Sequence, residues 1–163
     1  MSMMQLFAQI EQSDLSIWVR ESLWAFPTLL VAHAVSMGGL AGGGMILALR
    51  AIGFAQGVPY RALGWFLPVM AWGGFVASVS GGLLLAGYPA KALTNPVFAL
   101  KFLFLAAAIG LGRFVWVRSR GLVGGAALSV DVRWAAGFSL LMWVGVIAAG
   151  RFLAYTHRLL LVS

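Results

Sequence analysis

Long apolar runs separated by short polar segments dominate this chain. A helix needs roughly 20 apolar residues to cross a bilayer, and four runs are that long. They lie at residues 27–49, 60–87, 96–116 and 131–160. The pattern predicts an all-α fold, an up-down bundle of four transmembrane helices in a single membrane domain over residues 1–163.

The segment before the first run has a different pattern. Residues 14–24 place Leu15, Trp18 and Trp24 among charged and polar side chains, and Ser13 is well placed to cap a helix that starts there. This predicts a short amphipathic helix in the membrane interface. The preceding residues include Glu11 and lack the basic start of a signal peptide, so we expect them to be retained.

Prolines and capping residues predict where the spans begin and bend. Pro68 lies inside the second run and predicts a kink there. Asn95 followed by Pro96 predicts a capped start for the third helix. Residues 117–129 are predicted to be a solvent-facing loop, with Ser129 as the cap of the last helix.

Composition narrows the class of protein. Of the 163 residues, 62% are hydrophobic and 9% are charged, which is typical of membrane proteins. The net charge of +7 does not indicate a nucleic-acid partner, because the basic residues lie mostly between apolar runs. The absence of cysteine excludes disulfides, thiolate metal sites, iron–sulfur clusters and covalently attached haem.

The basic residues are unequally divided between the two ends of the predicted bundle. The first-to-second and third-to-fourth connections carry Arg50, Arg61, Arg113, Arg118, Arg120 and Arg133, against Asp131 alone. The other end carries Arg20, Lys91, Lys101 and Arg158, against Glu11, Asp14 and Glu21. The positive-inside rule therefore predicts a multi-pass protein of the bacterial inner membrane, with both termini in the periplasm.

Few side chains within the spans can do chemistry, and they gather near one end. These candidates are His33, Lys101, Arg151, Tyr155 and His157. At a rise of about 1.5 Å per residue, His33, Lys101 and His157 lie roughly 9, 8 and 6 Å from the periplasmic ends of their helices. Arg151 lies roughly 15 Å from the same end. Ionisable groups at such depths are costly, so each is a candidate for function.

Two histidines at similar depth suggest a haem b site. His33 and His157 would be its axial ligands, with Lys101 and Arg151 on the propionates and Tyr155 in support. Alternative readings are a His33 that only hydrogen-bonds between helices and a His157 that only contacts lipid headgroups. Glycine pairs in the first two spans, such as Gly81-Gly82, allow a flat cofactor or simply tight helix packing.

A second chemistry is soft-metal binding. His33 and Met37 are four residues apart, hence on one helix face, and imidazole with thioether suits copper(I). Packing is the more common role of a methionine in an apolar helix.

Several segments together resemble an uncharacterised bacterial family of four-helix inner-membrane proteins, loosely described as CopD-like. They are ESLWAFPTLLVAHAVSMG, LPVMAWGGFVASVSGGLLLAGYPAKALTNPVFALKFLFL and SLLMWVGVIAAGRFLAY, within residues 17–156. The resemblance implies the same topology and highlights His33, Lys101, Arg151 and Tyr155. It does not highlight His157, which lies beyond the last segment.

These observations lead to three hypotheses of function. The first is a membrane subunit that binds haem b near the periplasmic face and relays electrons between a periplasmic redox partner and the quinone pool. The second is a CopD-like protein for copper or a small solute, and the third is a non-redox anchor subunit of a larger membrane complex. We expect membrane lipids and protein partners in a membrane complex, with a quinone as a further partner of the first hypothesis. The chain is expected to be an electron-transfer or anchor subunit rather than a stand-alone enzyme.

Overall fold

The computed structural model describes residues 3–121 and 128–159, without the side chains of Met4, Lys91 and residues 154–159. All regular elements in this part of the chain are helical, as predicted. In order they are α1 (Met3–Glu11), α2 (Asp14–Glu21), α3 (Ala25–Ile52), the 3-10 helix η1 (Tyr60–Trp65), α4 (Phe66–Gly87), α5 (Pro89–Leu93), α6 (Pro96–Ser119) and α7 (Val130–Leu159).

Four stretches are long and apolar enough to cross a membrane, which confirms the predicted number of spans. They are Ala25–Ile52, Tyr60–Gly87, Pro96–Ser119 and Val130–Leu153. The first begins two residues earlier and ends three residues later than predicted. The third continues to Ser119, so the predicted loop at 117–129 begins three residues too early. Apolar helices tolerate an extra turn at their ends, because the flanking arginines can reach water from there.

Pro68 lies at the start of α4 rather than in the helix interior, where it was predicted to cause a kink. The second span opens as η1 and changes to α-helix at Phe66, so Pro68 falls in the first turn of α4. Proline is tolerated in a first turn because the N–H it lacks would have no intrahelical acceptor there. The prediction for Asn95 is confirmed: its side chain accepts a hydrogen bond from Val97 N at 2.9 Å, and Pro96 is the first helical residue.

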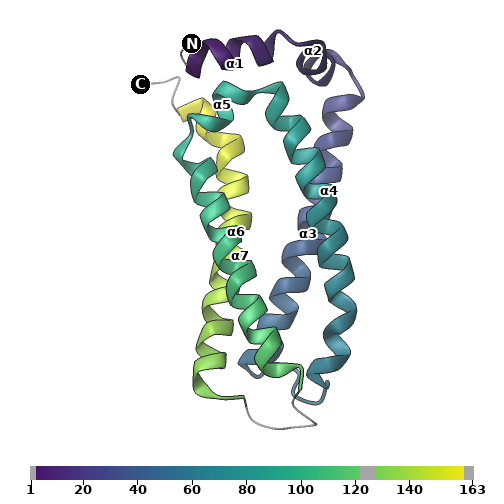
Figure 1. Cartoon of the computed structure of the whole chain (residues 1–163), viewed down its shortest axis with the longest axis vertical. Coiled ribbons are helices and arrows are strands. Elements are labelled where there is room, and N and C mark those ends of the chain that lie inside the picture. Colours follow the sequence, from purple (N-terminus) through teal and green to yellow (C-terminus); the bar gives the residue numbers. More distant parts are fainter. Residues whose placement is uncertain (1–2, 122–127, 160–163) are drawn as a thin grey trace.

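The N-terminal segment holds two helices where one was predicted. α2 ends at Glu21 rather than at Trp24, and α1 precedes it. Ser13 caps α2 as predicted, accepting a hydrogen bond from Ser16 N at 3.3 Å. The buried Ser16 hydroxyl donates to Gly87 O at 3.4 Å and so joins α2 to the end of α4. Figure 1 shows α1 and α2 lying across one end of the long helices.

The long helices associate as two pairs. α3 packs along α4, α6 packs along α7, and the two pairs meet mainly where α3 contacts α7 (Figure 1). α4 and α6 are not a closely packed pair. The opposite end of the bundle from α1 and α2 holds residues 53–59, η1 and the end of α6. We call it the connection end.

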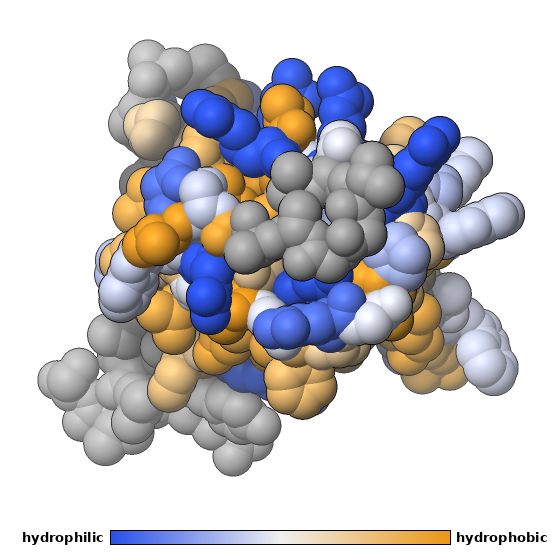
Figure 2. All heavy atoms as spheres, turned by 90° about the horizontal axis from the view of Figure 1, so that it is seen from below, coloured by the Kyte–Doolittle hydropathy of each residue, from blue (hydrophilic) through white to orange (hydrophobic). Residues whose placement is uncertain are grey.

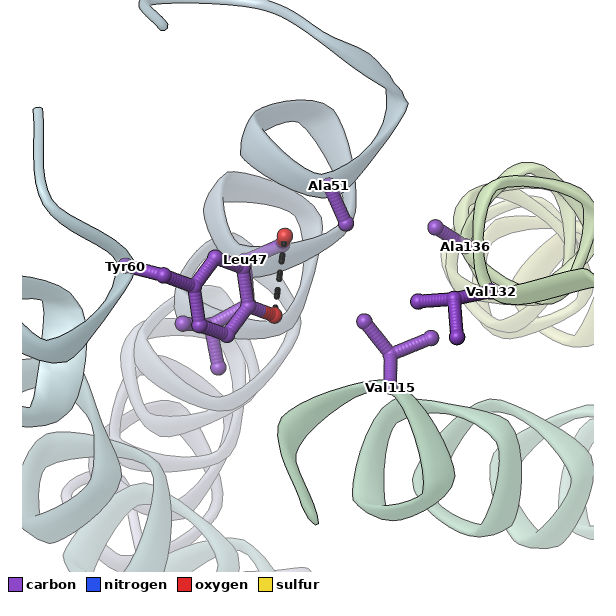
Figure 3. Close-up of a cluster of buried hydrophobic side chains, with 6 residues drawn as sticks. All are labelled: Leu47, Ala51, Tyr60, Val115, Val132 and Ala136. Atoms are coloured by element: carbon purple, nitrogen blue, oxygen red, sulfur yellow. Dashed lines mark hydrogen bonds between the residues drawn. The ribbon is translucent and has the colours of Figure 1, made fainter. Parts of the chain in front are cut away.

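Two buried clusters hold the pairs together. The first lies at the connection end and comprises Leu47, Ala51, Tyr60, Val115, Val132 and Ala136 (Figure 3). In this cluster the Tyr60 hydroxyl donates to Leu47 O at 3.3 Å, which satisfies the one polar atom of the tyrosine side chain. The second, midway along the bundle, comprises Leu40, Ala41, Ala108, Trp143 and Val146. Its Trp143 packs closely against Gly44, where a Cβ would clash with the indole ring.

The outer surface of the long helices is apolar, as a bilayer requires. Exposed side chains include Val35, Trp72, Phe75, Leu103, Phe138, Leu141 and Phe152, each more than half exposed. Seen from the connection end, hydrophilic side chains gather on the end face of the bundle (Figure 2). An apolar belt with a polar end is the surface of a membrane protein rather than of a soluble one.

Candidate functional site

His33 lies on α3 and turns its ring toward α4. Its Nδ1 is 3.0 Å from the Ala77 carbonyl oxygen and 3.2 Å from Ser80 Oγ. A carbonyl oxygen can only accept, so a hydrogen bond to Ala77 O requires the tautomer of His33 with its proton on Nδ1. The ring is half-buried and ties the two helices of one pair together.

The opposite ring nitrogen faces a second helix pair. Lys101, on α6, places its Nζ 3.4 Å from His33 Nε2. The sequence predicted that these two residues share a layer, and the structure brings them into direct contact. The Lys101 side chain is also half-buried, and its Cε lies 3.9 Å from where a Cβ on Gly150 of α7 would stand. All four long helices therefore meet around this contact.

No carboxylate of the spans balances the positive charge of Lys101 beside His33. Within the four spans the sequence holds one carboxylate, Asp131, and it lies in the first turn of α7 at the connection end. His33 and Lys101 thus have no carboxylate of the spans at their own end. An imidazolium beside an ammonium would add a second uncompensated charge in an apolar setting. The contact is consistent with a neutral His33 whose Nε2 accepts from the Lys101 ammonium.

Arg151 does not join the His33–Lys101 contact. It lies on α7 one residue after Gly150, and its side chain is exposed. Tyr155 and His157 lie on the helical backbone of α7, but their side chains are outside the described residues. The predicted pairing of His33 with His157 therefore stays a prediction.

Met37 lies one turn after His33 but packs elsewhere. Its side chain lies against the buried cluster around Leu40 and Trp143. Among the described residues, no group of three or more His, Cys, Asp or Glu could hold a metal ion. Copper binding by His33 and Met37 would thus need a further ligand, and it stays a hypothesis.

Three α4 residues that hold His33 were not predicted. Ser80 and the Ala77 carbonyl contact Nδ1, and Gly81 lies against the ring. A Cβ on Gly81 would stand 2.9 Å from His33 Cε1, closer than real Cβ atoms come, whereas Gly82 has open space. The glycine pair was the one signal in the sequence, and it did not tell which glycine faces the histidine.

Comparisons with known proteins give no further guide to this site. No family model matches the chain, and neither the curated proteins nor the solved structures hold a match. The resemblance to the CopD-like family therefore stays a prediction.

Proposed function

We propose that the chain is a redox subunit of the bacterial inner membrane, with haem b bound at His33. In this proposal the four spans form an up-down bundle, and α1 and α2 lie in the periplasmic interface. The exposed apolar residues near α2 support that placement: Leu23 and Trp24 are 86% and 82% exposed, as expected of side chains that meet lipid. The arginine-rich connection end would face the cytoplasm.

The orientation can be tested with single cysteines, because the chain has none. Gln12, between α1 and α2, and Gln56, in the α3–η1 connection, are both exposed. In cells with a permeabilised outer membrane, a membrane-impermeant maleimide should label Gln12→Cys but reach Gln56→Cys only after lysis. The reverse pattern would overturn the periplasmic assignment.

The observation that carries the haem proposal is the state of His33. With Nδ1–H donated to a backbone carbonyl, Nε2 keeps its lone pair and faces the centre of the bundle. A metal-bound histidine usually shows this arrangement, since the hydrogen bond at one nitrogen sets the tautomer and the other nitrogen binds. The neighbouring Lys101 cation suits a ligand with acidic groups, and Gly81 lets the His33 ring lie close against α4.

Lys101 would have to move before a haem iron could bind His33 Nε2. Lys101 Nζ stands 3.4 Å from Nε2, in the space that a ligated iron would need. Lys101 would therefore swing aside on a flexible four-carbon stem, and its ammonium would then be free to pair with a propionate. When bound, haem supplies reversible one-electron transfer; His33 holds it, and His157 is proposed as the second ligand. A periplasmic redox partner and a quinone would be the electron donor and acceptor.

Visible spectroscopy of the purified protein tests the proposal. After expression with ample haem precursor, a low-spin b-type Soret band with reduced α and β bands is expected. A folded protein with no Soret band would refute it. Copper in metal analysis would then favour the CopD-like hypothesis, and co-purifying membrane partners with an inert spectrum would favour the anchor hypothesis.

A further inference from the structure

The Ser80 hydroxyl donates its hydrogen bond to backbone carbonyls of its own helix, α4. Its Oγ lies 2.6 Å from the Val76 carbonyl oxygen and 3.4 Å from that of Ala77, and both can only accept. Toward His33 Nδ1, 3.2 Å away, Ser80 Oγ is therefore an acceptor. Two acceptors, this hydroxyl and the Ala77 carbonyl, converge on one nitrogen of the ring.

By holding the proton at Nδ1, these two acceptors determine whether His33 Nε2 is protonated. A neutral imidazole carries one proton, so a proton held at Nδ1 leaves Nε2 bare. The Lys101 ammonium, a donor with no lone pair, matches a bare Nε2 and would clash with a protonated one. The acceptors at Nδ1 and the ammonium at Nε2 thus both favour the Nδ1–H tautomer of His33.

We propose that Ser80 is a positioning residue that holds His33 as the Nδ1–H tautomer with Nε2 directed at Lys101. Ser80 is 3% exposed, so water cannot easily replace its oxygen. The inference rests on the proposed function only in treating Nε2 as the ligand atom. The tautomer itself is a property of the protein without any cofactor.

Nitrogen NMR of haem-free protein reads the tautomer directly. The chain has 2 histidines, so a His157→Gln background leaves His33 as the sole labelled imidazole. The background protein should show a protonated Nδ1 and an unprotonated Nε2. In Ser80→Ala one of two acceptors is lost, and the ratio of Nε2–H to Nδ1–H tautomer should rise about fivefold, the effect of one ordinary hydrogen bond.

Two variants separate this role from general packing. Ser78→Ala removes a hydroxyl that, among the described residues, donates to Gly74 O on the same helix, so it should leave the His33 signals unchanged. Ser80→Thr keeps a hydroxyl and should restore the Nδ1–H tautomer. A background protein in the Nε2–H form, or a Ser80→Ala spectrum identical to it, would overturn the proposal. A missing Soret band with the expected tautomer would refute haem binding alone.

Discussion

Replacing His33 by alanine is expected to abolish the b-type spectrum of the haem-loaded protein. Among the described side chains, the substitution removes the imidazole whose Nε2 faces Lys101 while Nδ1 contacts the Ala77 carbonyl. Without His33, haem would keep a single proposed ligand, His157, together with contacts to Lys101 and apolar side chains. We expect at least a tenfold loss of bound haem at equal protein, in line with the loss of a ligand or its partner. The pyridine haemochrome assay measures it.

Met37→Leu is the matched control for that variant. It lies one turn away on the same helix and packs in an apolar cluster, where leucine fills a similar volume. Haem content should be unchanged in Met37→Leu if the proposal is right. Normal haem content in His33→Ala would show that this histidine only ties α3 to α4. Copper lost from both variants would instead point to the soft-metal site.

Gly73→Ala is expected to destabilise the bundle strongly. A Cβ there would lie 2.7 Å from Ser36 O and 3.0 Å from Leu40 N, both backbone atoms of α3. A backbone cannot rotate aside as a side chain can, so α3 and α4 must separate. Overpacking of this kind costs about 2 kcal/mol, which lowers the unfolding temperature by roughly 4–8 °C in a chain of this size. Thermal unfolding in detergent, followed by size-exclusion chromatography, measures it.

Gly74→Ala controls for the change of residue type. Its Cβ would lie 3.9 Å from the Leu40 side chain, an ordinary contact, so the unfolding temperature should stay the same or rise slightly. Gly73 also lies on the α3–α4 contact that holds His33 against Ala77 and Ser80. Separation of the helices should therefore weaken the His33 contacts as well. Equal stability of the two variants would show that α3 and α4 do not approach as closely as described.

The sequence alone determined the four spans and some of the helix termini. Length and apolar content identify a helix that crosses a bilayer, because no other single segment satisfies its backbone there. Local chemistry set several termini correctly, such as the Asn95 side chain on Val97 N and the Ser13 cap of α2. These contacts join neighbours in the chain, so spacing is enough to predict them. α1 was not predicted, because the residues before Ser13 were considered only as a possible signal peptide.

Only the tertiary structure decided which face of each span turns inward. In a soluble helix a polar face marks the outside, but lipid is as apolar as the bundle core, so these spans are apolar all round. The sequence could place His33 and Lys101 at one depth, since depth follows from counting residues. It could not show that Nε2 faces Lys101, that Ser80 holds Nδ1, or that Gly73 rather than Gly74 meets α3. Those facts depend on the rotation of each helix about its axis, which close packing of small residues sets and hydrophobic patterning does not record.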